Sequence, residues 1–591
     1  MKKRLRFFLW GICFLLFHFQ SFAQSKTVTG TVTSASDKIQ LPGVSVTVKG
    51  QPRGTVTDAA GSYSIKVEPS DVLVFSFIGM KAQERTVGNA AVIDVVLQND
   101  AQSLDEVVVT ALGIKQEKKA LGYAITEVKG ATIAQTQREN FVNGLAGRVA
   151  GVDVNTTSGM PGASTSIMIR GVSSLSGSNQ PLFVVDGLPI SNSTFNTSAF
   201  ASTASSATSL NNRSTDFTNR GADINPEDIE SITILKGPEA SALYGIDAAS
   251  GAVVITTKRG KAGAARIDYS NNFRMERINK FPEIQQVYGL GVNGVTDNTG
   301  RETSYFGGRY PEGTQFYDNV DKFFQNGFTQ RHNLSFSGGS DKATYRISSS
   351  YTGQDGFVPG TDLTRLNLSS AVTAELNKYI SADLTFAYTN TDNNSAFKGA
   401  GGPLLGLLTW PSTDDASVYM TPNGQRRFYS AGDNEIENPF FNVNKNTINN
   451  TNNRYISNAR LSIEPLEWLR FVGNAGFDFS SGKITMVRHP ESAYGFSRGG
   501  IFDQSLDNTR NFNLQYYGEA NRSFFNDKFN ANLKIGSALN AQETYTQAVT
   551  GERFLAPGLF SIENTDNTTH RGRNRLSQRR LVGVFCNLTM D

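Results

Sequence analysis

The stretch after residue 265 alternates apolar and polar side chains in short segments, and this alternation constrains the fold more than any other feature. In the segment Leu469–Ser480, every second residue from Leu469 to Phe479 is apolar or Gly, whereas Arg470, Asn474 and Asp478 occupy positions between them. A period of two places these two sets on opposite faces of a β-strand. The pattern predicts a transmembrane β-barrel whose apolar side chains face lipid and whose polar side chains face the lumen.

Ten segments follow this pattern, at about 266–275, 330–338, 343–352, 364–374, 379–390, 455–463, 469–479, 512–521, 528–540 and 579–590. The gaps between them alternate in length: 276–329, 353–363, 391–454, 480–511 and 541–578 are long, whereas 339–342, 375–378, 464–468 and 522–527 are short. Long loops at one end and short turns at the other are typical of bacterial outer-membrane barrels. A soluble β-sandwich, the alternative for alternating strands, gives no reason for this sorting. After the N-terminus the chain holds no run of about 18 apolar residues, so helices are not expected to span a membrane.

The N-terminus predicts export. Residues 1–23 combine four cations within Lys2–Arg6, an apolar stretch from Phe7 to Phe19 and the small residues of Ser21–Ala23, which are the parts of a cleavable signal peptide. The apolar stretch is too short to act as a membrane anchor. The whole chain has 56 Lys plus Arg against 53 Asp plus Glu, so removing four cations leaves 52 against 53. This balance indicates no basic surface for nucleic acid.

Residues 24–98 predict a small β-sandwich. Seven short β-prone runs separated by turn residues cover 27–32, 44–48, 55–57, 62–67, 72–77, 83–87 and 91–97. The segments Pro42–Val46, Gly54–Asp58 and Gly61–Ile65 resemble the carboxypeptidase-regulatory-like domain. Peptidase activity is not expected, because no histidine falls in this region.

A β-prone run follows in the linker of residues 99–119, namely Asp105, Glu106, Val107, Val108, Val109 and Thr110. The sequence offers this run no local partner strand, and an unpaired strand can receive another chain by strand addition. The run resembles the TonB box of outer-membrane active transporters. Any buried strand could carry the same apolar residues, so this interpretation depends on its position between the sandwich and the glycine-rich region that follows.

Residues 120–260 contain glycine-punctuated motifs in a fixed order. They are Leu145–Val152, Ile167–Gly171, Pro181–Gly187, Ile234–Pro238, Ser241–Gly245 and Gly251–Thr257. In this order they resemble the plug domain of SusC/RagA-type TonB-dependent transporters, and the resemblance covers almost all of the chain from Gln24 to Asp591. The glycines at 147 and 151 are not followed by the Lys-Ser/Thr ending of a phosphate-binding loop, which argues against nucleotide binding.

The resemblance implies a mainly β protein that consists of the sandwich, a plug at 120–260 and a transmembrane barrel that begins at residue 261 and continues to 591. It implies active import of a large nutrient, a glycan oligosaccharide or a peptide, across the bacterial outer membrane, with no cofactor and no chemistry on the nutrient. The implied partners are TonB with ExbB-ExbD, which would pair with residues 105–110, a SusD-like surface lipoprotein and outer-membrane lipid.

The resemblance also implies contacts between plug and barrel. Arg170 and Lys236 match positions where related transporters place plug cations against barrel carboxylates, and Glu519 has the parity of a lumen-facing residue. We therefore expect these three residues to seat the plug, although a salt bridge within the plug is an equally good role for the cations.

Ten strands are fewer than the roughly 22 that a plugged barrel of this kind requires. Since the chain also ends at Asp591 without a terminal aromatic residue, we expect an incomplete barrel, the N-terminal portion of a longer transporter. An open ten-stranded sheet would expose unpaired backbone groups to lipid, so we expect this chain alone to give no uptake.

Two other functions remain open. A TonB-linked signalling receptor would need a different N-terminal extension, and a surface adhesin or structural barrel would need neither the TonB box nor the plug. An enzyme is not expected, because no catalytic set of His, Asp and Ser and no pair of carboxylates stands out, and no metal site is predicted. Aromatic residues in the long loops, Tyr305–Phe306, Trp410 and Phe440–Phe441, could grip a nutrient or pack the loops together.

Overall fold

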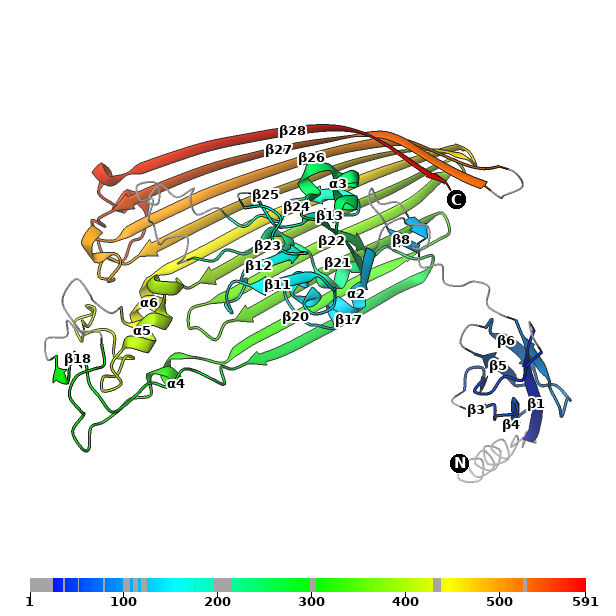
Figure 1. Ribbon diagram of the computed structural model, residues 1–591, viewed down its shortest axis with the longest axis horizontal. Coiled ribbons are helices and arrows are strands. Elements are labelled where there is room, and N and C mark those ends of the chain that lie inside the picture. Colours follow the sequence, from blue (N-terminus) through cyan, green and yellow to red (C-terminus); the bar gives the residue numbers. More distant parts are fainter. Residues whose placement is uncertain are drawn as a thin grey trace, which may run out of the picture. The chain divides into compact units, whose positions relative to one another are not determined.

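A computed structural model of the chain describes residues 25–35, 38–51, 53–77, 80–98, 107–109, 115–117, 125–175, 177–195, 215–297, 304–428, 437–524 and 529–590. The predicted signal peptide, residues 1–23, lies outside these ranges. The chain divides into two compact units, residues 1–107 with 117–119, and residues 108–116 with 120–591 (Figure 1). No helix in the described ranges is long and apolar enough to cross a membrane.

The N-terminal unit is a sandwich of two small sheets. One has the order β4 (Ser62–Val67), β1 (Lys26–Ser34), β7 (Val95–Leu97), and the other the order β3 (Gly54–Val56), β2 (Ser45–Val48), β5 (Val72–Ser76), β6 (Gln83–Thr86). Alternate residues of the strands point inward, as in β4, where Tyr63, Ile65 and Val67 are buried. Each of the seven predicted runs overlaps one of these strands, so the predicted sandwich is confirmed.

Tyr63 provides a pH-dependent test of this core. Its hydroxyl donates to the Ile93 carbonyl at 2.8 Å, and burial, with a smaller effect of the Asp94 carboxylate, raises the pKa of Tyr63 to about 12. Because the ordinary value is about 10, the phenol contributes its full stability below about pH 10, and the sandwich loses stability as pH rises toward 12. Tyr63 is the single tyrosine in residues 25–98, so tyrosinate absorbance of this isolated domain reports it directly.

The matched variant for this test is Asp94→Asn. It should lower the pKa of Tyr63 part of the way toward 10, since burial remains. A titration midpoint near 10 in the folded wild-type domain would contradict the buried position of Tyr63.

The short strands β8 (Val107–Val109) and β9 (Lys115–Glu117) lie where the sequence passes from the first unit to the second. They are followed by a compact domain that we call the plug-like domain, residues 125–257. Its main sheet has the order β10 (Ile125–Lys129), β15 (Ile229–Leu235), β16 (Ala252–Thr257), β13 (Leu182–Val185), β14 (Leu188–Ile190), and a separate hairpin joins β11 (Val152–Thr156) to β12 (Thr165–Ile169). The helices are α2 (Gly130–Ala134), α3 (Pro238–Tyr244), η3 (Phe141–Leu145), η7 (Arg220–Asp223), η8 (Pro226–Asp228) and η9 (Gly245–Ala248).

Apolar side chains of the motifs predicted for the plug form the core of this domain. Leu145, Ile167, Phe183, Ile234 and Val253 are completely or almost completely buried in one cluster. Gly130 is required where β10 passes into α2, because a Cβ atom there would lie 1.9 Å from the Ile229 carbonyl oxygen.

A ten-stranded antiparallel sheet, which we call the wall, makes up the remainder of the second unit. Its strands, in spatial and sequence order, are β17 (Gly263–Glu276), β20 (Gly327–Gly339), β21 (Ala343–Asp355), β22 (Asp362–Asn377), β23 (Ile380–Ser395), β24 (Thr447–Leu466), β25 (Leu469–Arg488), β26 (Ile501–Phe524), β27 (Phe529–Glu552) and β28 (Arg571–Met590). The ten predicted strands and their order are confirmed. The plug-like domain lies against one face of this sheet (Figure 1).

The long loops gather at one end of the wall and the short turns at the other (Figure 1). The long loops contain β18 (Gly291–Val292), β19 (Val295–Thr296), α4 (Asn319–Phe323), α5 (Pro403–Thr409), α6 (Pro439–Lys445), η10 (Gly399–Gly401), η11 (Phe496–Arg498), η12 (Ile562–Asn564) and η13 (Asn567–Thr569). The predicted alternation of loop lengths is therefore confirmed.

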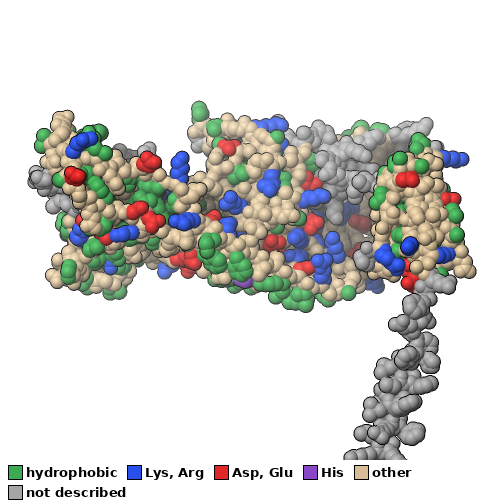
Figure 2. Space-filling view, turned by 90° about the horizontal axis from the view of Figure 1, so that it is seen from below, with side chains coloured by type: hydrophobic (Ala, Val, Ile, Leu, Met, Phe, Trp, Pro, Cys, Tyr) green, Lys and Arg blue, Asp and Glu red, His purple; other side chains and the backbone are tan. Residues whose placement is uncertain are grey.

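The two faces of the wall differ as the alternation predicted. On β20, Arg331, Asn333 and Ser335 are buried on the face toward the plug-like domain, whereas Leu334 and Phe336 are exposed on the other face. Hydrophobic side chains gather along the outer margin of this unit (Figure 2). Polar lumen and apolar outer face are the division expected of a membrane barrel.

Several strands are longer than the sequence predicted. β26 begins at Ile501 rather than near residue 512, and β28 begins at Arg571 rather than near 579. The additional parts carry polar residues on both faces, so their side chains do not alternate, and they are held by continuous pairing with β27. Strand continuity there comes from the backbone ladder, which a pattern of side chains does not report.

Candidate functional site

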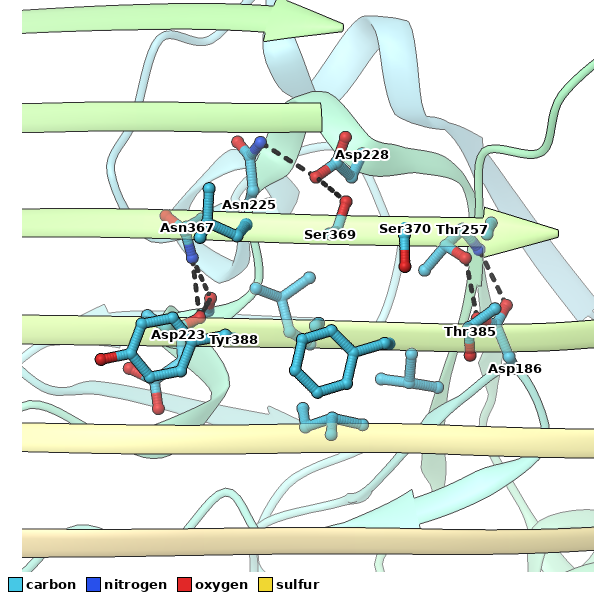
Figure 3. Close-up of a pocket in the computed structure, with 18 of the residues that line it drawn as sticks. Asp186, Asp223, Asn225, Asp228, Thr257, Asn367, Ser369, Ser370, Thr385 and Tyr388 are labelled. Carbon is cyan, nitrogen blue, oxygen red and sulfur yellow. Dashed lines mark hydrogen bonds between the residues drawn. The ribbon is translucent and has the colours of Figure 1, made fainter. Parts of the chain in front are cut away.

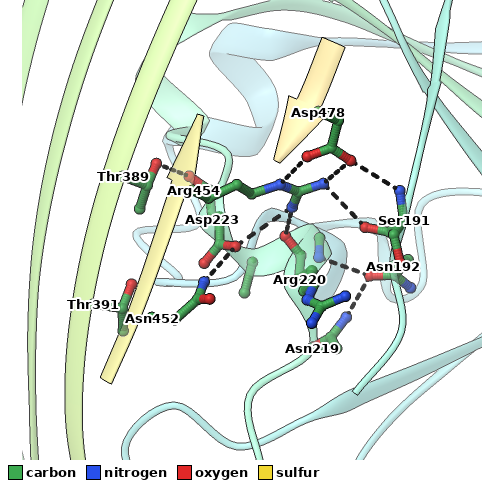
Figure 4. A network of polar contacts seen from close by, with 12 residues as sticks. Ser191, Asn192, Asn219, Arg220, Asp223, Thr389, Thr391, Asn452, Arg454 and Asp478 are labelled. Carbon is green, nitrogen blue, oxygen red and sulfur yellow. Dashed lines mark hydrogen bonds and ion pairs between the residues drawn. The ribbon is translucent and has the colours of Figure 1, made fainter. Parts of the chain in front are cut away.

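The face of the wall that meets the plug-like domain carries buried ion pairs, and Arg454 of β24 is the most buried of these residues. Its Nε donates to Asp478 Oδ1 at 2.9 Å and its Nη2 to Asp478 Oδ2 at 3.0 Å, so the pair across β24 and β25 is bidentate. The guanidinium also reaches the plug-like domain, where it donates to the carbonyls of Ser191 and Arg220 and lies 3.4 Å from Asp223 Oδ2 (Figure 4). One side chain thus joins two strands of the wall to two segments of the plug-like domain.

Asp223 belongs to η7, whose position is fixed by asparagine side chains. Asn192 accepts hydrogen bonds from the Gly221 N–H at 2.8 Å and from the Asn219 amide at 2.7 Å. Gly221 is necessary here, because a Cβ atom would lie 2.3 Å from Asn192 Oδ1. Burial raises the pKa of Asp223, and the charges of Arg454, Arg365 and Arg220 act against that rise.

A second contact surrounds Asp228, at the end of η8 (Figure 3). Asp228 Oδ1 accepts from Arg346 at 2.9 Å and from the Ser348 hydroxyl at 2.7 Å, and Oδ2 accepts from Ser369 at 3.0 Å. These three partners stand on the neighbouring strands β21 and β22. Asn225 of the plug-like domain also donates to Oδ2, at 3.1 Å, and these four donors together compensate for the burial of the carboxylate.

Other wall arginines contact the backbone of the plug-like domain. Arg365 donates to the Ala222 carbonyl at 2.8 Å, and Arg331 to the Arg138 carbonyl at 2.9 Å. Arg274 pairs with Glu139 at 2.8 Å. In most of these contacts, therefore, an arginine of the wall supplies the positive charge, and the plug-like domain supplies a carboxylate or a carbonyl oxygen.

The sequence analysis predicted the reverse arrangement, in which the plug cations Arg170 and Lys236 face the wall carboxylate of Glu519. Glu519 lies 3.1 Å from Lys534, its direct neighbour across the β26–β27 ladder. The predicted pairing of Glu519 with a plug cation is therefore wrong. Arg170 is exposed at the turn after β12, and Lys236 follows β15 and is half-buried. A plug cation does meet a wall carboxylate at Arg220, which lies 3.0 Å from Asp507.

The sequence did contain a pattern that could have predicted the contacts between the wall and the plug-like domain. Arg274, Arg331, Arg346, Arg365 and Arg454 lie in or next to the predicted strands and all have lumen-facing parity. A series of arginines on the polar face of neighbouring strands needs buried acceptors, and a domain inside the lumen is the place to find them.

The segment resembling a TonB box is described in part. Asp105, Glu106 and Thr110 lie outside the described residues, whereas Val107–Val109 form β8, which pairs with β9 in a two-stranded sheet. The expectation of no local partner was therefore wrong, because β9 is near enough in the chain to pair with β8. The role of residues 105–110 in binding TonB stays a prediction.

The aromatic side chains of the long loops mostly pack the loops together. Trp410 and Phe441 are 2% and 0% exposed, and the Phe440 ring lies 5.2 Å from Phe323 of α4. Tyr305 donates its hydroxyl to the Thr409 carbonyl at 2.7 Å. Phe306 is 72% exposed, so among these aromatics it is the one open to a ligand.

A buried ion pair lies within the loop between β23 and β24, and its carboxylate connects this loop to the one between β25 and β26. Arg426 lies 3.1 Å from Glu437, which also accepts from the Ser492 hydroxyl at 2.8 Å and the Ala493 N–H at 2.8 Å. Burial raises the pKa of Glu437, against the effect of the Arg426 charge. The loops therefore form one packed layer at their end of the wall.

Two families match parts of the chain. Residues 117–252 match the TonB-dependent Receptor Plug Domain, and residues 28–109 match the CarboxypepD_reg-like domain. Similar proteins include TonB-dependent receptor P39 of Formosa agariphila, 31% identical over 539 residues (87% of this chain, 46% of that protein), and TonB-dependent receptor SusC of Bacteroides thetaiotaomicron, 28% identical over 547 residues (88% of this chain, 50% of that protein).

A solved structure of the RagAB peptide importer in its 'open-open' state resembles this chain with a TM-score of 0.63, at 20% identity, over 82% of this chain and 54% of that one. At this identity the likeness shows the fold alone. The chain spans about half the length of the curated relatives it matches.

Proposed function

Because this chain belongs to the SusC/RagA-type TonB-dependent receptors, we propose that it serves the active import of a large nutrient across the bacterial outer membrane. The observation that supports this most is the plug-like domain held against the polar face of the wall by Arg454, Asp223 and Asp228. A domain fixed in the lumen by buried ion pairs prevents free diffusion, so passage requires work on that domain.

The energy would enter through residues 105–110. An isolated two-stranded sheet has little stability in water, so β8 can leave β9 at small cost and pair with TonB by strand addition. TonB with ExbB-ExbD would then deliver energy from the proton gradient of the inner membrane, since the outer membrane has no ATP to supply it. Pulling on β8 would remodel the plug-like domain and open the lumen.

The proposal includes a surface partner and a location. The layer of packed long loops offers a platform for a SusD-like lipoprotein acting as a lid, and the exposed apolar face of the wall fits the lipid of the outer membrane. The nutrient would be a glycan oligosaccharide or a peptide, carried without chemical change. The match of residues 28–109 to the CarboxypepD_reg-like domain favours import over signalling, which would need a different N-terminal extension.

The test is uptake by the complete receptor in cells with and without functional TonB. A panel of glycans and peptides is offered, and binding at the surface is measured separately from accumulation. We expect accumulation only with TonB, and surface binding in both strains. Equal accumulation in the two strains would rule out energised import.

A further inference from the structure

One row of side chains crosses the outer face of the wall from β23 to β28. Its members stand directly opposite one another in the ladders and are, in order, Tyr388, Tyr455, Phe479, Arg510, Glu543 and Gln578. The ring centroids of Tyr388 and Tyr455 lie 4.9 Å apart, and the Arg510 guanidinium lies 5.9 Å from the centroid of the Phe479 ring. Because aromatic side chains of outer-membrane barrels gather where hydrocarbon meets headgroups, we call this row the boundary row.

The outer face of the wall changes in character at the boundary row. On the side of the long loops, the next outward residues of β23 to β26 are polar, namely Asn390, Asn453, Ser481 and Asn508. On the side of the short turns, the second outward residue is apolar on all six strands, namely Leu384, Ala459, Ala475, Leu514, Leu539 and Val582. The boundary row therefore marks where the apolar outer face ends, on the side of the long loops.

Arg580 of β28 lies on the apolar side of the boundary row. The next outward residue of the same strand, Val582, is 73% exposed. No carboxylate among the described residues forms an ion pair with Arg580. Glu543 of the boundary row is engaged by Arg510 at 3.7 Å and by the Gln578 amide at 2.7 Å. A charged group beside hydrocarbon is costly unless an opposite charge meets it, so Arg580 needs an anion at the depth of the lipid headgroups.

Arg510 stands near enough to Arg580 to share such an anion. Their strands have β27 between them, and their rows are one outward position apart. This placement corresponds to roughly 12 Å between the two Cα atoms, a gap that two long side chains can close around one group. The Arg510 side chain is 62% exposed. Together with Glu543, the two arginines carry one net positive charge, so this place on the outer face favours an anion.

We propose that Arg510 and Arg580 bind a phosphate group of lipopolysaccharide, the lipid of the outer leaflet of the bacterial outer membrane. A planar guanidinium donates two parallel hydrogen bonds to a phosphate. Phe477 and Phe512, in the same row as Arg580, would contact the first part of the acyl chains. The site lies on the side of the long loops, which face the cell exterior in barrels of this kind. This inference rests on the proposed location in the outer membrane and adds a bound lipid to the proposed import.

The test titrates the complete receptor, purified in a nonionic detergent, with diphosphoryl lipid A and with dephosphorylated lipid A. Microscale thermophoresis gives the dissociation constants. We expect the diphosphoryl form to bind with an affinity that falls as salt rises, and the dephosphorylated form to bind weakly. Arg510→Gln/Arg580→Gln should weaken binding of the diphosphoryl form by about tenfold for each arginine. Arg510→Lys/Arg580→Lys keeps both charges and should retain part of the affinity.

The matched control is Arg522→Gln. Arg522 lies on β26 with the same parity as Arg510, but at the end of the strand next to the short turn, so this variant should bind as the wild type does. Equal affinity of the wild type for the two forms of lipid A would overturn the proposal. So would wild-type affinity of the double glutamine variant, or an equal loss of affinity in Arg522→Gln.

Uptake by the complete receptor in cells separates a failure of this inference from a failure of the proposed function. Absence of lipid A binding, together with TonB-dependent uptake, would reject the lipid site and leave the proposed import in place. Binding of lipid A through Arg510 and Arg580, without TonB-dependent uptake, would have the reverse meaning.

Discussion

Replacing Val108 with proline should abolish import by the complete receptor and leave nutrient binding at the cell surface unchanged. Proline removes a backbone N–H and fixes φ, so β8 can no longer form a regular ladder with an added strand. The plug-like domain and the wall have their own cores and do not depend on β8. The measurement is accumulation of a labelled nutrient beside surface binding, with accumulation expected to fall to the level of cells that lack the receptor.

Two further variants make this prediction specific. Val108→Thr keeps the N–H and the β-propensity, so it should import normally. Gln116→Pro disrupts β9 and leaves β8 intact, so it separates loss of the β8–β9 pair from loss of pairing with TonB. Full uptake by Val108→Pro would remove residues 105–110 from the coupling mechanism.

Arg454→Met should destabilise the complete receptor by about 3–5 kcal/mol, because it leaves two buried carboxylates, Asp223 and Asp478, without their shared cation. Both carboxylates and the arginine side chain are almost completely buried. The measurement is thermal unfolding of the purified receptor. A loosened plug-like domain should also admit large antibiotics, which provides a second measurement in cells.

The control for this prediction is Arg510→Met. Arg510 pairs with Glu543 at 3.7 Å, and the two side chains are 62% and 37% exposed, so the loss of this pair should cost at most about 1 kcal/mol. The double variant Arg454→Met/Asp478→Leu should recover part of the stability, since it removes one of the unpaired charges. Equal effects of Arg454→Met and Arg510→Met would contradict a special role of the Arg454 contact.

The wall could be predicted from the sequence because each of its strands has one apolar and one polar face. This period of two, together with the alternation of loop lengths, was sufficient to find ten strands and their order. The strand ends were missed wherever both faces are polar, as in the first parts of β26 and β28. There the backbone ladder continues after the side-chain pattern has ended.

The contacts that hold the plug-like domain against the wall were harder to predict. The alternation of side chains along a strand shows which face a residue occupies, but not how deeply it is buried or which residue lies next to it. Glu519 does face the lumen, yet Lys534 lies at the same distance from the turn that joins β26 to β27 and neutralises it. Hairpin register alone would have shown this pair. The contacts of Arg454 required the fold itself, since Ser191, Asp223 and Asp478 come from three separate parts of the chain.

The position of β10 determines what yields first when the plug-like domain is pulled. β10 is an edge strand with one neighbour, β15, and five paired residues, whereas the ion pairs of Asp223 and Asp228 stand on η7 and η8, much later in the chain. In the proposed import cycle, a pulling force on β8 reaches β10 before it reaches those pairs. Because β10 is held by a single short ladder, it detaches from the sheet first. β15 then remains in place, so β10 can form its backbone hydrogen bonds with β15 again. Under the proposed function, the lumen would open and reseal while the ion pairs of η7 and η8 stay intact.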